Sequence, residues 1–544
     1  CQGRQPGTEG DSWPLTGGRN QAGTCGVDAS AAVNSDVYKI TSDFTPLREI
    51  DETSFSALIN WDIGFANLRA NLGVFDYEEF RLTDSDFSFA ASVWQENNPG
   101  VTPPTSTGPG YWQQCWGGPT CGLAAGQRVV SKAEQADINL NSNSDGALQW
   151  TLGFFYYDDS GAGDTSSEFV WGYTDTNDPQ SISWGHWLYQ GNGGTKSTAI
   201  YGQAEYSFTD RTRGTLGLRR SKDERNFFNK YVDWGPSVHG FGAGYYAAHY
   251  SDPGSRFDPW PSYVETAATE ASRQSGEKEN TDWKVAIQHD LTDEMMIYGS
   301  AATGYIAGAI AGGGSTDLTQ PNEVTSYELG LKSTLLDGTM RLNMAAFFND
   351  YEGLTTSAFV AQGQTIVAVQ NVGGTMESTG LEVEMNWAAS DRFQINAGLA
   401  LNDSELKNFG RSVLNRVFQA GGDQEIGTAD PCDQTCSQVY VLDGKKARFS
   451  PDWTLSVNAT YEFDMMGGTF TPGVYLYHSD DYKTTNIEYF FTKQDAYTTV
   501  DLRATWRSLE SPLSVQAFVL NASDETVQVG GDQFSQGRAV ADFN

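Results

Sequence analysis

The residues best suited to bind a ligand are tryptophans and tyrosines in three stretches that lack hydrophobic periodicity. Their rings are flat and amphipathic, so they can stack on sugars, catecholates or corrin-like planes. We therefore expect a small-molecule or chelate ligand to contact them. The alternative is that the rings pack loops together or form an aromatic girdle at a membrane surface. The candidate ligand-binding residues are Trp112, Trp116, Trp171, Trp184, Trp187, Trp234, Tyr245, Tyr246 and Trp260.

The six cysteines fall into three close pairs in stretches rich in Gly, Pro or Asp, outside the periodic segments. This placement predicts disulfides that close loops and that form in an oxidising compartment. Zinc binding is the competing interpretation, but the cysteines have no nearby histidines, and the whole chain has only five. The pairs are Cys1 with Cys25, Cys115 with Cys121, and Cys432 with Cys436.

Groups that could support metal binding or catalysis are sparse. His186, His239 and His249 lie in the aromatic stretches beside acidic residues, but their scattered spacing does not predict a metal site. The acid pair Glu382 and Glu384 lies on the wet face of a predicted strand, which explains it without chemistry. The sequence contains no P-loop, HExxH or Gly-x-Ser-x-Gly motif. We expect no enzyme activity and no cofactor.

The charge balance limits the class of partner. The chain has 69 acidic and 34 basic residues and a formal net charge of −35. Phosphate binding needs a basic face, so nucleic acid is excluded as a partner. An acidic, solvated surface is the simple interpretation, and acidic loops that collect cations near an entrance are the alternative.

The elements that would carry these residues have a hydrophobic period of two. Segments 380–387 and 393–402 each place apolar side chains on one face and polar or charged ones on the other, which predicts β-strands. The pattern recurs at 341–348, 454–463 and 500–506. No run approaches the roughly 20 apolar residues of a membrane-spanning helix. A spanning strand of about 9–11 residues would hide its membrane signal, because only alternate residues face lipid.

The lengths of the connections distinguish a membrane barrel from a soluble sandwich, in which strands also alternate. Short turns are predicted at Asp62 to Ala66, Ser142 to Gly146, Thr209 to Thr212, Leu291 to Glu294, Leu336 to Thr339, Ser390 to Arg392, Asp464 to Gly468 and Ser508 to Pro512. Long irregular connections are predicted at 82–128, 160–196, 226–276, 306–322, 354–375, 408–445 and 480–495. Short periplasmic turns and long extracellular loops are typical of outer-membrane barrels.

The predicted fold is an all-β, transmembrane antiparallel β-barrel with about 16 or 17 visible strands. The first strands are 51–61 and 67–81, and the last are 513–521 and a possible strand from Gly537. An open edge in lipid would leave backbone groups unpaired, so the barrel is expected to close. The opening residues read as a loop between barrel strands, so residues 1–544 are expected to be a partial barrel domain.

Several segments resemble the C-terminal barrel of TonB-dependent outer-membrane receptors. They are MMIYGSAATGYIAGAI (295–310), YELGLKSTLLDGTMRLNMAAFFNDYEGL (327–354), NVGGTMESTGLEVEMNW (371–387), FQINAGLALNDSEL (393–406) and VQAFVLNASDET (515–526). Within the second segment, Asp337 and Gly338 predict a tight hairpin with a two-residue connection, because they tolerate the positive φ angles that it needs.

The resemblance implies a 22-stranded barrel in the outer membrane of a Gram-negative bacterium, filled by an N-terminal plug. It implies uptake of a scarce nutrient, siderophore-bound iron first and otherwise a vitamin or saccharide, with energy from the TonB–ExbB–ExbD complex. The barrel would also contact outer-membrane lipid and lipopolysaccharide. The sequence shows neither a plug-like region nor a TonB-box-like segment. A passive porin-like channel or a structural scaffolding barrel is the alternative function.

Overall fold

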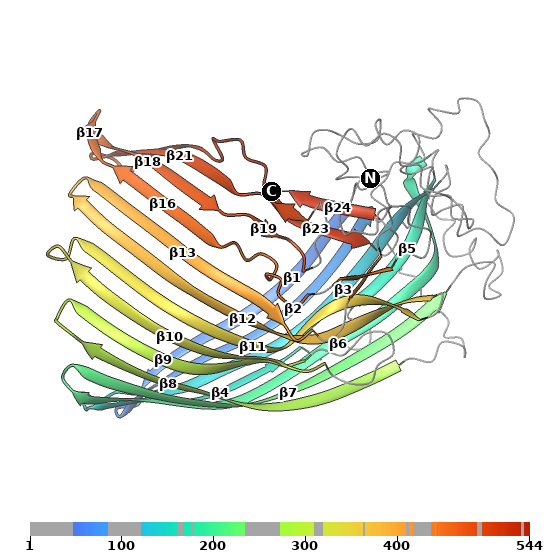
Figure 1. Cartoon of the computed structure of the whole chain (residues 1–544), viewed down its shortest axis with the longest axis horizontal. Coiled ribbons are helices and arrows are strands. Elements are labelled where there is room, and N and C mark those ends of the chain that lie inside the picture. The colour runs from blue at the N-terminus through green and yellow to red at the C-terminus, as the bar shows by residue number, and fades with distance from the viewer. Residues whose placement is uncertain are drawn as a thin grey trace.

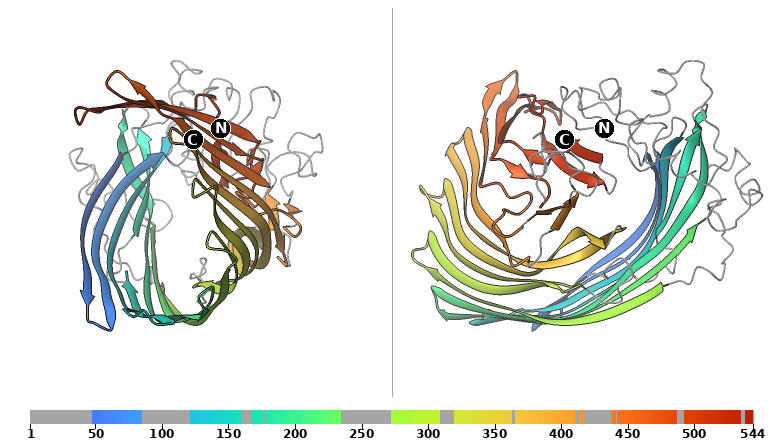
Figure 2. Two further views of the ribbon diagram at one scale, coloured as in Figure 1. Left: turned by 90° about the vertical axis from the view of Figure 1, so that its left-hand side faces the viewer. Right: turned by 45° about the vertical axis from the view of Figure 1, so that its right-hand side comes forward.

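The protein is an antiparallel β-sheet of strongly curved shape (Figures 1 and 2). The computed structural model describes residues 47–84, 121–159, 167–175, 178–233, 272–308, 319–362, 365–409, 413–416, 437–440, 442–486, 492–534 and 538–543. In these ranges the chain forms strands, turns and irregular segments and has no helix long and apolar enough to cross a membrane.

One sheet contains 18 of the described strands. Its first half comprises β1 (Leu47–Asp62), β2 (Ala66–Asp84), β3 (Cys121–Ser142), β4 (Leu148–Asp158), β5 (Ser167–Asp175), β6 (Asp178–Thr209), β7 (Thr212–Asp233), β8 (Ser272–Asp290) and β9 (Met295–Ile306). Its second half comprises β10 (Asn322–Leu335), β11 (Met340–Gln362), β12 (Thr365–Ser390), β13 (Phe393–Lys407), β16 (Trp453–Tyr461), β17 (Phe463–Met465), β18 (Gly468–Ser479), β21 (Tyr497–Ser508) and β22 (Ser514–Val519).

The strands pair in chain order, each antiparallel to the next. β5 runs between β3 and β6 beyond the end of β4, and β17 extends β16 along β18, so the 18 strands occupy 16 positions in the wall. This agrees with the expected 16 or 17 strands. Among the described residues, β1 pairs with β2 and β22 with β21, and no pairing joins β1 to β22.

Three short hairpins lie outside the wall. They are β14 (Val413–Arg416) with β15 (Ser437–Tyr440), β19 (Tyr482–Lys483) with β20 (Lys493–Gln494), and β23 (Gln528–Phe534) with β24 (Arg538–Phe543). The possible strand from Gly537 therefore exists as β24, but it pairs with β23 and not with the wall. The β19–β20 and β14–β15 hairpins fall inside connections that were predicted to be irregular.

The predicted short turns are all present, and they gather at one end of the wall, which is on the left in Figure 1. The connection between β10 and β11 differs in detail from the prediction. It has four residues, because Leu335 pairs with Met340. Asp337 and Gly338 have the expected positive φ angles of 52° and 89°, and Leu336 joins them with a φ of 51°. A leucine in this conformation costs energy that Asp or Gly would not.

Several predicted long connections are wrong in extent, because strands continue into them. Region 160–196 contains β5 and the first part of β6, and region 354–375 contains the outer parts of β11 and β12. β3, β7 and β8 also extend into regions 82–128 and 226–276. Between β9 and β10, residues 307–308 and 319–321 are not in strands, and residues 309–318 lie outside the described residues. In the extended parts backbone ladders continue although the apolar alternation has ended.

The two faces of the wall have different chemistry. On β3, β4, β6, β7 and β8 the residues of one face are large, apolar and exposed, and we call this the apolar face. A continuous exposed surface of this kind is the lipid-facing side of a barrel strand. It includes Ile138, Leu148, Leu152, Phe154, Ile200, Tyr206, Leu216, Leu218, Trp283, Val285 and Ile287. The opposite side, the polar face, carries the charged and hydroxyl groups.

The described residues hold one small hydrophobic core, at the loop end of β13. Leu406, Phe409 and Leu442 are almost fully buried, and Leu354, Met376 and Ala447 pack against them. Gly374 makes room for this core, since a Cβ atom there would lie 2.4 Å from the ring of Phe409. The core joins the β11–β12 hairpin to the segment that leads into β16.

Candidate functional site

The polar face of the wall has aromatic rings that lie flat over glycines of the neighbouring strand. Tyr201 on β6 pairs with Gly153 on β4, where a Cβ atom would lie 2.0 Å from the tyrosine Cζ. The Tyr201 hydroxyl donates to Asp137 Oδ1 at 2.8 Å. The Arg219 guanidinium lies 5.3 Å from the centre of the Phe155 ring and 5.6 Å from that of Tyr201. The group thus combines a carboxylate, a cation and flat rings on four adjacent strands, β3, β4, β6 and β7.

The same arrangement of a tyrosine ring over a glycine recurs on β9 and β10. Tyr298 on β9 pairs with Gly330 on β10, where a Cβ atom would lie 2.3 Å from the tyrosine ring. The Tyr298 hydroxyl donates to Glu328 Oε1 at 2.5 Å, and Lys332 Nζ lies 5.7 Å from the ring centre. A glycine opposite each ring leaves a flat aromatic surface facing the interior, on which a planar group can lie.

A third polar group lies toward the loop end of the same face. Arg225 Nη1 donates to Thr195 Oγ1 at 2.6 Å, and the backbone N–H of Thr195 donates to Asp159 Oδ1. The Tyr157 hydroxyl donates to the other oxygen of Asp159 at 3.2 Å. Within the described part of the chain, Arg225 Nε and Tyr305 Oη are buried and have no hydrogen-bond partner. Buried donors without a partner are costly, so a bound water or a ligand group is expected to satisfy these two.

On the same face, the loop ends of β1 and β2 carry a compact ion pair. Arg48 Nε and Nη2 donate to the two oxygens of Glu79 at 2.9 and 3.2 Å, and the Tyr77 hydroxyl also donates to Glu79. Glu79 is 8% exposed. The hydrogen bonds from Arg48 and Tyr77 lower the pKa of the Glu79 carboxyl group below its ordinary value. This carboxylate therefore stays charged near neutral pH and fixes the positions of both partners.

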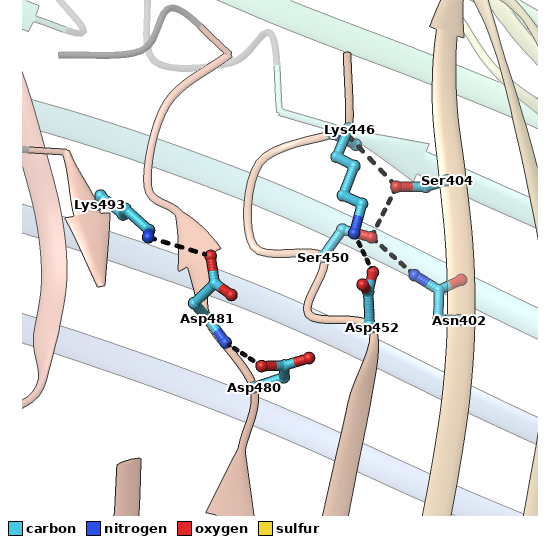
Figure 3. Close-up of polar contacts among 9 residues, drawn as sticks. Asn402, Ser404, Lys446, Ser450, Asp452, Asp480, Asp481 and Lys493 are labelled. Atoms are coloured by element: carbon cyan, nitrogen blue, oxygen red, sulfur yellow. Dashed lines mark hydrogen bonds and ion pairs between the residues drawn. The ribbon is translucent and has the colours of Figure 1, made fainter. Parts of the chain in front are cut away.

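The rim above β13, β16 and β18 is held by the polar contacts drawn in Figure 3. Ser450 Oγ accepts from Asn402 Nδ2 at 2.6 Å and lies 2.7 Å from Ser404 Oγ. Lys446 forms an ion pair with Asp452 in the same segment. A second short ion pair, between Lys493 Nζ and Asp481 Oδ2 at 3.5 Å, joins β20 to the segment before β19. The Ser450 contacts attach this segment to β13 of the wall, whereas the two ion pairs join rim residues to one another.

The predicted aromatic residues are only partly located. Trp171 lies on β5, paired in register with Ala125, whereas Trp184 and Trp187 lie on β6. They belong to strands and not, as expected, to an irregular loop. Their ligand contacts remain predictions, as do those of the other six aromatic residues, which lie outside the described residues: Trp112, Trp116, Trp234, Tyr245, Tyr246 and Trp260.

The disulfide prediction stays a prediction. Cys121 is the first residue of β3, so it does not lie in an irregular stretch as expected. The remaining cysteines, Cys1, Cys25, Cys115, Cys432 and Cys436, lie outside the described residues. Among the His, Cys, Asp and Glu side chains that the structure does describe, no group of three is arranged to hold a metal ion.

No pattern in the sequence predicted the group around Arg225 and Tyr305. Its members come from β4, β6, β7 and β9, and only the register of the sheet brings them together. Alternation could have placed Tyr157 and Arg225 on the polar side of their own strands. It does not show how far each strand is shifted along its neighbour.

Solved structures with the same architecture include receptors for iron chelates. The ferric yersiniabactin uptake receptor FyuA of Yersinia pestis matches with a TM-score of 0.61 and 13% identity, over 92% of this chain and 60% of that chain. The siderophore receptor PiuA of Acinetobacter baumannii matches with a TM-score of 0.58 and 14% identity, over 91% and 63%. At such identities the likeness shows the fold. This chain spans about three fifths of the length of these receptors.

The sequence comparison agrees with this fold. The probable TonB-dependent siderophore receptor PiuA of Acinetobacter baumannii is 29% identical over 228 residues, which are 40% of this chain and 29% of that protein. A family model described as TonB dependent receptor-like, beta-barrel, matches residues 7–522. That match covers most of the sequence, and the chain therefore belongs to the family of TonB-dependent receptor β-barrels.

Proposed function

We propose that this chain is the transmembrane barrel of an outer-membrane receptor that takes up siderophore-bound iron by TonB-coupled transport. The observation that carries the proposal is the family match over residues 7–522. The short-turn end of the wall faces the periplasm and the long-loop end faces the outside. A vitamin or a saccharide is the alternative cargo within the same mechanism.

The partners follow from the same proposal. An N-terminal plug domain fills the barrel and contacts the TonB–ExbB–ExbD complex across the periplasm. Outer-membrane lipid and lipopolysaccharide surround the apolar face, whose exposed large side chains need a hydrocarbon environment. The family is one of receptors and transporters, and we expect no catalytic step on the cargo.

The polar face supplies contacts for an anionic chelate. Arg225 Nε and Tyr305 Oη are buried donors without a partner in the described residues, and both lie toward the loop end. A carboxylate, catecholate or hydroxamate oxygen is an acceptor that could satisfy such donors. The rings of Tyr201 and Tyr298 lie deeper along the same face.

Binding of ferric chelates tests the proposal. The full-length receptor, purified in detergent, is titrated with ferric catecholate, hydroxamate and citrate complexes while tryptophan fluorescence is followed. At least one complex is expected to bind, and Tyr305→Phe and Arg225→Gln should each weaken that binding roughly tenfold, as loss of a charge-assisted hydrogen bond does. If none of the complexes binds, iron chelates are not the cargo.

The variants separate a binding role from a structural one. Tyr305→Phe removes a buried hydroxyl group that has no protein partner, so stability should be unchanged or slightly higher while binding weakens. Lys132→Gln is the matched control, since Lys132 pairs with Asp76 on the opposite face of the wall. Equal loss of binding in Lys132→Gln and Arg225→Gln would show that the Arg225 group is not the contact.

A further inference from the structure

The segment that leads into β16, residues 442–452, crosses the polar face of the wall at its loop end, and we call it the rim segment. Ser450 Oγ accepts a hydrogen bond from Asn402 Nδ2 on β13 at 2.6 Å (Figure 3). Asn402 lies on the polar face, in the same row of paired residues as Glu328. Leu442 is 1% exposed in the small core and anchors the start of the segment. The rim segment is therefore attached to the wall at both ends.

Phe449, between these two attachments, has a backbone conformation that is costly for its residue type. Its φ is 54°, a left-handed conformation that glycine or asparagine adopts more cheaply. The backbone N–H of Phe449 donates to the carbonyl oxygen of Lys483 at 2.7 Å, which holds the segment in this conformation. Phe449 is nevertheless 49% exposed, so the strain does not serve to bury the ring. A strained residue that persists at an exposed position points to a functional role.

A second ring lies beside Phe449. Tyr482 on β19 is partly buried, and its ring centre lies 5.9 Å from that of Phe449 with 45° between the ring planes. The Tyr482 hydroxyl donates to the backbone oxygen of Gln528 at 3.2 Å, which fixes the orientation of the ring. Gln528 is 5% exposed and is itself held by Gln494, whose Oε1 accepts from the Gln528 backbone N–H at 2.7 Å. Two rings from different segments thus form one aromatic corner on the rim.

Arg448 brings a cation to this corner. Its backbone N–H donates to Asn486 Oδ1 at 3.2 Å, and the residue is exposed. The carboxylates of Asp452, in the same segment, and Asp481, next to β19, are already paired with lysines. Within the part of the chain that the structure describes, the Arg448 guanidinium has neither an ion pair nor a hydrogen bond. Its charge is therefore available beside the exposed ring of Phe449.

We propose that Arg448, Phe449 and Tyr482 bind an aromatic, anionic arm of the cargo, and that the cargo is a chelate of the catecholate or phenolate type. The two rings offer faces on which an aryl group stacks. The guanidinium forms charge-assisted hydrogen bonds with phenolate or carboxylate oxygens. A citrate or an aliphatic hydroxamate has no ring to stack and would use the cation alone. The inference rests on the proposed function and adds the chemical class of the chelate.

Isothermal titration calorimetry of the full-length receptor in detergent tests the site. The probes are a ferric tris-catecholate, a ferric trihydroxamate, ferric citrate and iron-free 2,3-dihydroxybenzoate, which represents a single arm. The tris-catecholate should bind the wild type, and the single arm should compete with it. Phe449→Leu and Arg448→Gln should each weaken binding of the tris-catecholate about tenfold, because each removes one stacking contact or one charge-assisted hydrogen bond.

Phe65→Leu and Arg341→Gln are the matched controls. Phe65 is a phenylalanine that is 67% exposed in the β1–β2 turn, and Arg341 is an exposed arginine on β11 next to the β10–β11 turn. Both lie at the short-turn end of the wall, so both variants should bind the tris-catecholate as the wild type does. Arg448→Lys should keep part of the affinity, because it retains the charge but loses the planar fork. The melting temperature of each variant checks that the fold is kept.

Three results would overturn the inference. They are binding of the citrate or hydroxamate complex without binding of the tris-catecholate, wild-type affinity in both Phe449→Leu and Arg448→Gln, and an equal loss of affinity in the two controls. In each of these cases the receptor still binds a chelate, so the proposed function stands. If no ferric chelate binds, the proposed function fails, and the inference fails with it.

Discussion

The carboxyl group of Glu79 shows how single residues fix the loop end of the wall. It accepts from Arg48 and Tyr77, and these bonds lower its pKa. A lowered pKa in the folded state means that the stabilisation is complete above the ordinary pKa of an unfolded glutamate, about 4.3. The stabilisation is lost as the pH falls through the lowered value.

Glu79→Gln should therefore melt at a lower temperature than the wild type at pH 7, and the difference should shrink as the pH falls below about 4.3 and through the lowered pKa of Glu79. Thermal unfolding of the detergent-solubilised protein, measured across this pH range, gives both melting temperatures. Glu134 lies on β3, on the face of the wall opposite to Glu79. Glu134→Gln therefore controls for the general effect of losing a negative charge. A difference between wild type and Glu79→Gln that is constant with pH would contradict the assignment.

Among the elements, the β11–β12 hairpin depends on an irregularity near its middle. The register shifts between Tyr351 and Leu354, where Gly353 has a φ of 69°. A Cβ atom on Gly353 would lie 1.9 Å from the backbone oxygen of Pro321, which has little freedom to move. This bulge lets Leu354 join the small core at the loop end of β13.

Gly353→Ala should destabilise the barrel by about 1–3 kcal/mol, from the strained φ and the backbone clash. Gly373→Ala lies on the paired strand near the same bulge, but its Cβ atom would meet nothing within 4 Å. It should be close to neutral. Denaturant unfolding of both variants in detergent checks the pair, and similar stability losses would contradict the role of Gly353.

The short turns were predictable because clean alternation ends abruptly at each of them. Segments 380–387 and 393–402 show this on either side of the turn at Ser390, where β12 and β13 pair as expected. The first half of β6 was missed because its residues, including Gly191 and Gly193, show no apolar alternation. Where both faces of a strand meet water, neither face needs apolar residues, so no alternation is expected. Backbone pairing with β5 and β7 still forms a ladder there.

At the scale of the whole molecule, the wall is much taller than a membrane. β6 has 32 residues, and at about 3.3 Å per residue it is roughly three times as long as a spanning strand of about 9–11 residues requires. The Arg225 group lies beyond the exposed apolar residues of the wall, on the part of the wall that extends past the bilayer. The sequence predicted a barrel, but it did not predict this group, because only the register of neighbouring strands assembles it.

Uptake of a radiolabelled ferric chelate by cells that express the full-length receptor, with and without a functional TonB, tests the central claim most directly. The chelate is first chosen from those that bind the purified protein. The proposed function predicts accumulation that exceeds the external concentration and stops when TonB is removed. Accumulation that continues without TonB, or that merely equilibrates with the medium, would contradict active transport and would indicate a passive channel.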